Sequence, residues 1–96
     1  MYNLRQIEEI LRQLKPELAR RFFVKKIGVF GSFASEEQNN HSDLDILVEL
    51  EKPIGWDFFR LEKFLEDQFG LKIDLVTPKA IKERLKDSIL KNIRYI

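Results

Sequence analysis

The chain has 96 residues, a net charge of +1 and no cysteine. This length allows one domain, residues 1–96, and the missing cysteine excludes disulfide bonds, thiolate metal sites and cysteine nucleophiles. Hydrophobic residues make up 44% and charged residues 34%, which is typical of a folded soluble domain and excludes a disordered chain. No apolar run approaches the ~18 residues of a membrane span, so we expect a cytoplasmic protein without membrane contact.

The first half of the chain predicts a helix, a strand and a helical turn. Asn3 is expected to cap the helix, whose apolar face carries Leu4, Ile7, Ile10, Leu11 and Leu14. Pro16 is expected to end this helix or to open a short second helix over residues 16–23. The apolar run over residues 26–30 predicts a buried strand that ends at Gly31-Ser32. A helical turn over residues 33–37 and a loop over residues 38–42 should follow.

The second half predicts two further strands, each followed by a helix. Residues 43–50 alternate, with Leu44, Ile46 and Val48 on one face and Asp43, Asp45 and Leu47 on the other. After Pro53 and Gly55, a helix should carry Phe58, Leu61, Leu65 and Phe69 and end at Gly70. Residues 71–76 predict the third strand, and Pro78 should open a last helix with Ile81, Leu85, Ile89 and Ile93 on one face. This order predicts an α/β (α+β) fold, a small mixed sheet covered by helices.

Three aspartates are candidate metal ligands. Asp43 and Asp45 lie two residues apart on one strand, so their side chains share a face, and Asp74 lies in the next strand along the chain. If the two strands are neighbours, the carboxylates converge, and unit charges ~4 Å apart repel by about 4 kcal/mol at an effective dielectric near 20. A cation would relieve this repulsion, and oxygen-only ligands favour Mg²⁺ or Mn²⁺. The alternative is that each aspartate is a solvated residue at a strand end.

Gly31 and Ser32 form a candidate phosphate site, because they lie between an apolar strand and a helical turn. Backbone N–H groups and a serine hydroxyl bind phosphate there, and glycine lets the anion approach closely. The alternative is a simple turn. His41, the one histidine, is expected in a surface loop. The aromatic residues Trp56, Phe58 and Phe59 could form a binding patch, although packing in the core is the favoured interpretation.

Taken together, these motifs resemble those of the nucleotidyltransferase superfamily that includes DNA polymerase β. The resemblance rests on Gly31-Ser32-Phe33-Ala34, on Ser42-Asp43-Leu44-Asp45-Ile46-Leu47-Val48, and on Lys72-Ile73-Asp74-Leu75-Val76-Thr77-Pro78. More narrowly, the chain resembles the minimal nucleotidyltransferases, or MNT proteins, over nearly its whole length. These are small stand-alone domains, often the antitoxin of a toxin–antitoxin pair. The implied fold is that of the polymerase β palm.

The resemblance also implies an activity and a set of site residues. Asp43, Asp45 and Asp74 would be the catalytic residues and would hold Mg²⁺ or Mn²⁺, while Gly31 and Ser32 would bind the outer phosphates of ATP. The family transfers a nucleoside monophosphate to a hydroxyl group and releases pyrophosphate. In the toxin–antitoxin branch, AMP goes to a tyrosine of a HEPN partner, an all-helical ribonuclease, which is thereby silenced.

Ser35 and Glu36 depart from the family pattern, which often has Arg-Gly at these positions. A cation near the phosphates is lost and an acid is gained, so we expect weak binding of ATP. One alternative function is therefore a catalytically silent antitoxin that covers its partner. Another is a nucleic-acid-binding module that uses the basic segment 79–94, although the acidic segment 36–51 argues against it. For partner docking, Ile89, Ile93 and Tyr95 are the candidates.

Overall fold

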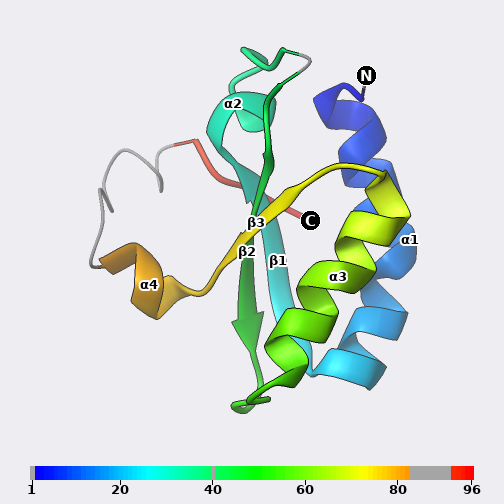
Figure 1. Cartoon of the computed structure of the whole chain (residues 1–96), viewed down its shortest axis with the longest axis vertical. Coiled ribbons are helices and arrows are strands. Elements are labelled where there is room, and N and C mark those ends of the chain that lie inside the picture. The colour runs from blue at the N-terminus through cyan, green and yellow to red at the C-terminus, as the bar shows by residue number, and fades with distance from the viewer. Residues whose placement is uncertain (1, 40, 83–91) are drawn as a thin grey trace.

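The computed structural model describes residues 2–39, 41–82 and 92–96. Four helices and four strands alternate along these segments (Figure 1). In chain order they are α1 (Leu4–Phe22), β1 (Val24–Phe30), α2 (Gly31–Ala34), β2 (Leu44–Leu50), α3 (Asp57–Phe69), β3 (Ile73–Val76), α4 (Pro78–Lys82) and β4 (Arg94–Tyr95). The mixed α/β architecture that the sequence predicts is confirmed, and no helix of the described segments is long and apolar enough to cross a membrane.

The four strands form one mixed sheet in the order β3-β2-β1-β4. Strand β1 pairs with β2 and with β4 in antiparallel fashion, whereas β2 and β3 are parallel. The parallel pair is possible because α3 carries the chain back along the sheet between the two strands. The β2–β3 register places Asp45 directly beside Asp74. The sheet thus brings together two of the three aspartates from distant points of the sequence.

The two faces of the sheet are covered differently (Figure 1). Helices α1 and α3 pack on one face, where Leu44, Ile46 and Val48 of β2 are fully buried. Leu47 points to the opposite face and is buried with Phe30, Val76 and Ile81 of α4. The alternation predicted for β2 is therefore confirmed. Because residues two apart on a strand share a face, Asp45 lies on the α4 face with Leu47, and Asp74 lies there with Val76.

Helix α1 begins as the sequence predicts. The Asn3 side chain accepts a hydrogen bond from the Gln6 N–H (2.8 Å), and the Gln6 side chain accepts one from the Asn3 N–H (3.0 Å). The expectation that Pro16 ends the helix or opens a second one is wrong, because α1 runs through Pro16 to Phe22. Pro16 is exposed, so its ring meets no neighbouring element, and the buried residues Leu11 and Leu18 hold the helix on both sides of it. Tertiary packing outweighs the local cost of the proline.

Replacing Pro16 by alanine should raise the free energy of unfolding by roughly 2 kcal/mol. Proline costs about 3 kcal/mol more than alanine inside a helix, and its rigidity in the unfolded chain returns part of this. Urea unfolding followed by circular dichroism measures the change. Gln13→Ala, at another exposed position of α1, should stay within about 0.5 kcal/mol of the parent. An unchanged or lower midpoint for Pro16→Ala would mean that the proline is accommodated without cost.

The predicted end of the last helix is wrong at Ile93, which is not helical and directly precedes the strand β4, because the chain there pairs with β1. Helix α3 ends at Gly70, which has φ 65°, as the glycine predicts. Helix α4 opens at Pro78, and the predicted continuation through Leu85 and Ile89 lies outside the described residues. The short strand β4 was not predicted. It pairs with β1, and the N–H of Ile96 donates to the Ile27 carbonyl (2.9 Å). This contact sets the C-terminal segment beside the first strand.

Candidate functional site

Asp45 and Asp74 form the centre of the candidate site. They are paired across the parallel strands β2 and β3, both are half-buried, and both side chains leave the sheet on the α4 face. Parallel strands lie ~4.8 Å apart, so two carboxylates in register meet at close range. The condition for the two carboxylates to converge, that these strands are neighbours, is met. The pair is a set of oxygen ligands without nitrogen or sulfur, which suits Mg²⁺ or Mn²⁺.

Gly31 lies directly under the Asp45 carboxylate. Phe30, the preceding residue, is the β1 partner of Asp45, so the chain turns into α2 at the point where the carboxylate projects. A Cβ atom on Gly31 would lie 2.0 Å from Asp45 Oδ2 and 2.9 Å from its Cγ, and Gly31 has φ 72°. Only glycine satisfies both conditions. The sequence suggested glycine here for phosphate binding, and the structure adds that it makes room for a carboxylate.

Asp43 is placed differently from the other two aspartates. It is exposed and precedes the first residue of β2, at the end of a tight loop. In this loop the Ser42 hydroxyl accepts a hydrogen bond from the Asn39 N–H (3.0 Å), and the Ser42 N–H donates to the Asn39 carbonyl (3.1 Å). Within residues 2–39, 41–82 and 92–96, no three histidine or acidic side chains gather closely enough to hold a metal ion. The structure thus joins Asp45 to Asp74 and leaves Asp43 at the rim.

Two glutamates of α3 add negative charge beside Asp74. Burial raises the pKa of Glu62, repulsion from Glu66 and Asp74 raises it further, and Lys72 acts in the opposite direction. The Glu66 carboxylate accepts a hydrogen bond from the Ile73 N–H (3.3 Å) at the edge of β3. These residues were not among the predicted ones. Their spacing of four on α3, just before a strand with an aspartate, is the signal that could have indicated them.

Ser35 and Glu36 follow α2, next to the predicted phosphate-binding residues. The Ser35 N–H donates to the Gly31 carbonyl (3.1 Å), so this short turn is closed on itself. Glu36 has φ 61°, in the left-handed region that favours glycine. The backbone therefore still has the shape that suits the glycine of the family pattern, while the side chain is a glutamate.

Changing Glu36 to glycine should raise the free energy of unfolding by up to about 1 kcal/mol, because the left-handed conformation costs a non-glycine residue ~1–2 kcal/mol and glycine's unfolded-state entropy offsets part of that. Adding Ser35→Arg should tighten ATP binding by roughly one to two decades at low salt, since it supplies a positive charge. Thermal unfolding and calorimetry measure the two effects. Glu37→Gly, which removes the same charge without a positive φ, should not stabilise the protein. Equal affinities for ATP with and without Ser35→Arg would mean that residue 35 points away from the phosphates.

Two predictions about other residues have opposite outcomes. His41 lies exposed in a loop, as expected. Core packing of the aromatic cluster is wrong for Trp56 and Phe59, whose exposed fractions are 83% and 59%. Helix α3 buries Leu61, Leu65 and Phe69, so Phe59, two residues before Leu61, falls on the outer face, and Trp56 precedes the helix. Phe58 alone of the three packs partly against the core.

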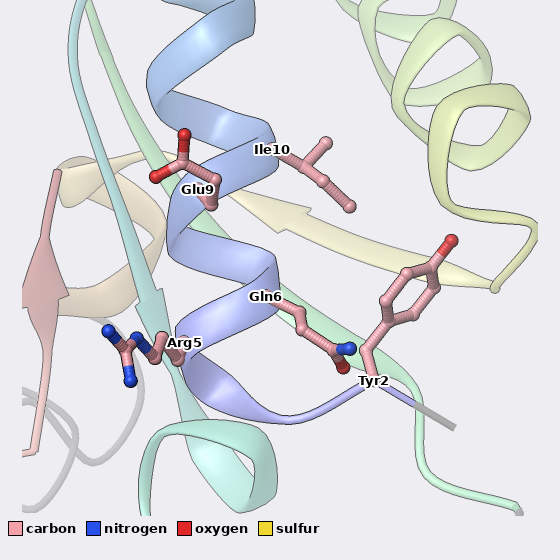
Figure 2. A pocket seen from close by; sticks show the side chains of 5 residues that line it. All are labelled: Tyr2, Arg5, Gln6, Glu9 and Ile10. Atoms are coloured by element: carbon pink, nitrogen blue, oxygen red, sulfur yellow. The ribbon is translucent and has the colours of Figure 1, made fainter.

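A depression of about 420 Å³ lies along the N-terminal half of α1, away from these residues. It is lined by Tyr2, Arg5, Gln6, Glu9 and Ile10, and Figure 2 shows Arg5 and Tyr2 on different sides of the helix. It contains none of the predicted site residues, and its cation and carboxylate offset each other. The predicted residues Asp45 and Asp74 lie on the α4 face, so this face is the candidate site, and the depression is not.

Comparison with known proteins identifies the family of this chain. Residues 4–96 match the family described as "Nucleotidyltransferase domain". The chain belongs to this nucleotidyltransferase family, and the resemblance to minimal nucleotidyltransferases is confirmed. The chain is 41% identical over its whole length to the protein adenylyltransferase MntA of Thermococcus cleftensis, of which it covers 98%. It is 44% identical to a predicted protein adenylyltransferase of Methanocaldococcus jannaschii, with each chain covered completely.

Solved structures show the same fold. A minimal nucleotidyltransferase superposes with a TM-score of 0.76 at 30% identity, covering 96% of this chain and 94% of the other. A toxin–antitoxin complex crystallised with AMP-PNP contains a chain that superposes with a TM-score of 0.69 at 21% identity, covering 98% of this chain and 72% of that one. At 21% identity, the similarity to the chain of the toxin–antitoxin complex shows a shared fold. Both agree with the mixed sheet described above, and the chain is a nucleotidyltransferase-family domain.

Proposed function

We propose that this chain transfers AMP from ATP to a tyrosine hydroxyl of a HEPN toxin in the cytoplasm and thereby acts as its antitoxin. The carrying observation is the Asp45–Asp74 pair, set in register and packed against Gly31. Support comes from the adenylyltransferase relatives at 41% and 44% identity, and from the toxin–antitoxin complexes with a similar fold. AMP-PNP in one of these complexes is an analogue of ATP, which supports ATP as the substrate.

In this proposal Asp43, Asp45 and Asp74 hold Mg²⁺ or Mn²⁺. The bound metal would supply positive charge at the phosphates of the nucleotide and lower the pKa of the acceptor hydroxyl. Asp45 and Asp74 share one face of the sheet. Asp43 lies two residues before Asp45, directly before the first residue of β2. Gly31 and Ser32 receive the outer phosphates, because the first N–H groups of a helical turn have no acceptor within the turn.

The transfer makes one bond and breaks one. The acceptor oxygen bonds to the α-phosphorus of ATP, and the bond from that phosphorus to the oxygen bridging to the β-phosphate breaks. Pyrophosphate leaves with this bridging oxygen, and the hydroxyl proton passes to a carboxylate of the site or to water. The contribution of the protein is to fix the nucleotide against the sheet, and that of the partner is to present the hydroxyl.

Calorimetry tests the assignment of the site. The parent chain is titrated with an ATP analogue that cannot be cleaved, in the presence of Mn²⁺, alongside Asp43→Asn and Asp45→Asn. Binding should depend on Mn²⁺ and weaken at least tenfold in each variant, because each change removes a negatively charged ligand. Unchanged affinity in both variants would show that the nucleotide and metal lie elsewhere.

A catalytically silent antitoxin is the second candidate function, and Ser35 and Glu36 favour it. The Glu36 N–H donates to the Phe33 carbonyl, so Glu36 stays close to α2. Its exposed carboxylate would repel a polyphosphate bound at Gly31 and Ser32. A silent antitoxin would form the complex with its toxin and inhibit it without any covalent change. Two titrations separate the functions: a silent chain would bind the toxin in a separate titration but would not bind the ATP analogue in the titration above.

A further inference from the structure

The connection between α3 and β3 is anchored on a single residue, Glu66. Its backbone carbonyl accepts a hydrogen bond from the N–H of Gly70, the residue that ends α3 (2.8 Å). Its side-chain carboxylate accepts a second one from the N–H of Ile73, the first residue of β3 (3.3 Å). Figure 1 shows this short connection between the end of α3 and the start of β3. One half-buried side chain therefore holds the point where β3 begins.

Strand β3 benefits from such an anchor because it is short and lies at the edge of the sheet. It has four residues, and within the described segments its one neighbouring strand is β2. The Lys72 carbonyl accepts a hydrogen bond from the Leu44 N–H of β2 (2.9 Å), so the backbone of residue 72 faces β2. The backbone groups of the next residue, Ile73, then point to the outer edge, where a strand leaves its N–H groups unpaired. The Glu66 carboxylate takes up the Ile73 N–H at this edge.

The hydrogen bond lies one residue from Asp74, the β3 member of the candidate site. Asp74 is in register with Asp45, and two carboxylates at close range repel each other before a cation is bound. This repulsion acts to move the edge strand away from β2. Helix α3 is packed into the core through its buried residues, so a hydrogen bond from Glu66 to Ile73 restrains β3 relative to the core.

We infer that Glu66 is a positioning residue for the candidate metal site, because its carboxylate holds the start of β3 and so keeps Asp74 beside Asp45. This inference rests on the metal-binding role proposed for Asp45 and Asp74. Ligands that are held in place bind a cation more tightly, since the apparent affinity falls with the fraction of molecules whose ligands are correctly placed. Glu66 acts through the backbone of β3 and does not itself contact the metal.

The negative charge of Glu66 could act on a cation as well, and two substitutions separate charge from position. Glu66→Gln removes the charge but keeps a side-chain oxygen that can accept the Ile73 N–H, whereas Glu66→Ala removes both. Glu62, one turn earlier on α3, also carries a negative charge near Asp74. Glu62→Ala therefore removes a neighbouring charge and leaves the anchor on Ile73 in place.

Binding of Mn²⁺ alone, followed by the electron paramagnetic resonance signal of the free ion, tests the inference. Glu66→Ala should weaken Mn²⁺ binding by about tenfold, the loss expected when a hydrogen bond that holds the competent state is removed. Glu66→Gln and Glu62→Ala, which remove only charge, should stay within about threefold of the parent. Asn3→Ala removes a side-chain hydrogen bond to a backbone N–H in α1 (2.8 Å), so it should lower stability but leave Mn²⁺ binding unchanged.

Amide hydrogen exchange measures the anchor directly and needs no metal. The Ile73 amide should exchange at least about threefold faster in Glu66→Ala than in the parent, and Glu66→Gln should keep the parent rate. An unchanged exchange rate in Glu66→Ala would show that the hydrogen bond does not hold the start of β3, and would overturn the inference.

The Mn²⁺ titrations give three further results that would overturn it. Equal affinity of the parent and Glu66→Ala would show that Glu66 does not position the site. Equal losses in Glu66→Ala and Glu66→Gln would assign the effect to charge, and an equal loss in Asn3→Ala would assign it to instability. In each of these cases the proposed metal site stands if Asp45→Asn abolishes binding. If Asp45→Asn binds Mn²⁺ as the parent does, the proposed site fails and the inference fails with it.

Discussion

Replacing Asp45 by asparagine should reduce the rate of AMP transfer by about 10³-fold or more. Asp45 is the carboxylate that the sheet sets beside Asp74 and that α2 packs against through Gly31. Asparagine keeps the shape but removes the charge that a divalent cation requires, and the charge stabilisation lost is worth several kcal/mol in the transition state. Initial rates of pyrophosphate release, measured with saturating partner and Mg²⁺, test the prediction.

Glu49→Gln is the matched control for this change. Glu49 is a half-buried carboxylate four residues along β2, on the same face as Asp45, but its partner across the sheet is Lys26 of β1. Neutralising it should change the rate by less than threefold. If Asp45→Asn and Glu49→Gln lower the rate equally, the effect comes from the general charge of the face. If neither lowers it, Asp45 has no part in the reaction.

Gly31→Ala should lower transfer by about 10²-fold or more. The new Cβ would lie 2.0 Å from Asp45 Oδ2, so the carboxylate must leave its position, and a displacement of ~1 Å at a reacting group can cost about 10²-fold. Because Gly31 has a positive φ, the alanine should also lower the free energy of unfolding by ~1–2 kcal/mol. Transfer rates and urea unfolding of the same preparations separate the two effects.

Gly70→Ala isolates the backbone contribution. Gly70 has φ 65°, close to the 72° of Gly31, but a Cβ there meets nothing within 4 Å. Gly70→Ala should therefore lose ~1–2 kcal/mol of stability and keep the parent rate. Equal loss of activity in both variants would attribute the effect of Gly31→Ala to instability. Full activity of Gly31→Ala would show that Asp45 tolerates displacement.

Much of this fold is predictable from the sequence because burial dominates its pattern. The alternation of Leu44, Ile46 and Val48 with Asp45 and Leu47 specifies both faces of β2, and both faces are covered. Asn3 and Gly70 mark helix ends through hydrogen bonding and a positive φ, which are local effects. Asp45 and Asp74 come together once β2 and β3 are neighbours. The helix α3 between these strands is the kind of crossover that joins neighbouring parallel strands.

The features that the sequence did not predict depend on how the folded chain packs and turns around each residue. Pro16 violates a local rule, and packing on both sides of it maintains the helix. Glu36 adopts a left-handed backbone that its residue type does not favour, because the turn after α2 fixes it. The exposure of Trp56 and Phe59 depends on which face of α3 meets the sheet, and apolar side chains alone do not specify that face. The metal-binding role of Asp43 stays a prediction.

The most direct test of the account is transfer of label from ATP carrying ³²P at the α-phosphate. The chain is incubated with Mg²⁺, with and without its helical toxin partner, and the labelled residue is mapped by mass spectrometry. Label should appear on a partner tyrosine, only when both proteins and Mg²⁺ are present, and it should be absent with Asp45→Asn. A tight complex in which no label ever reaches the partner would contradict AMP transfer and leave the silent antitoxin as the function.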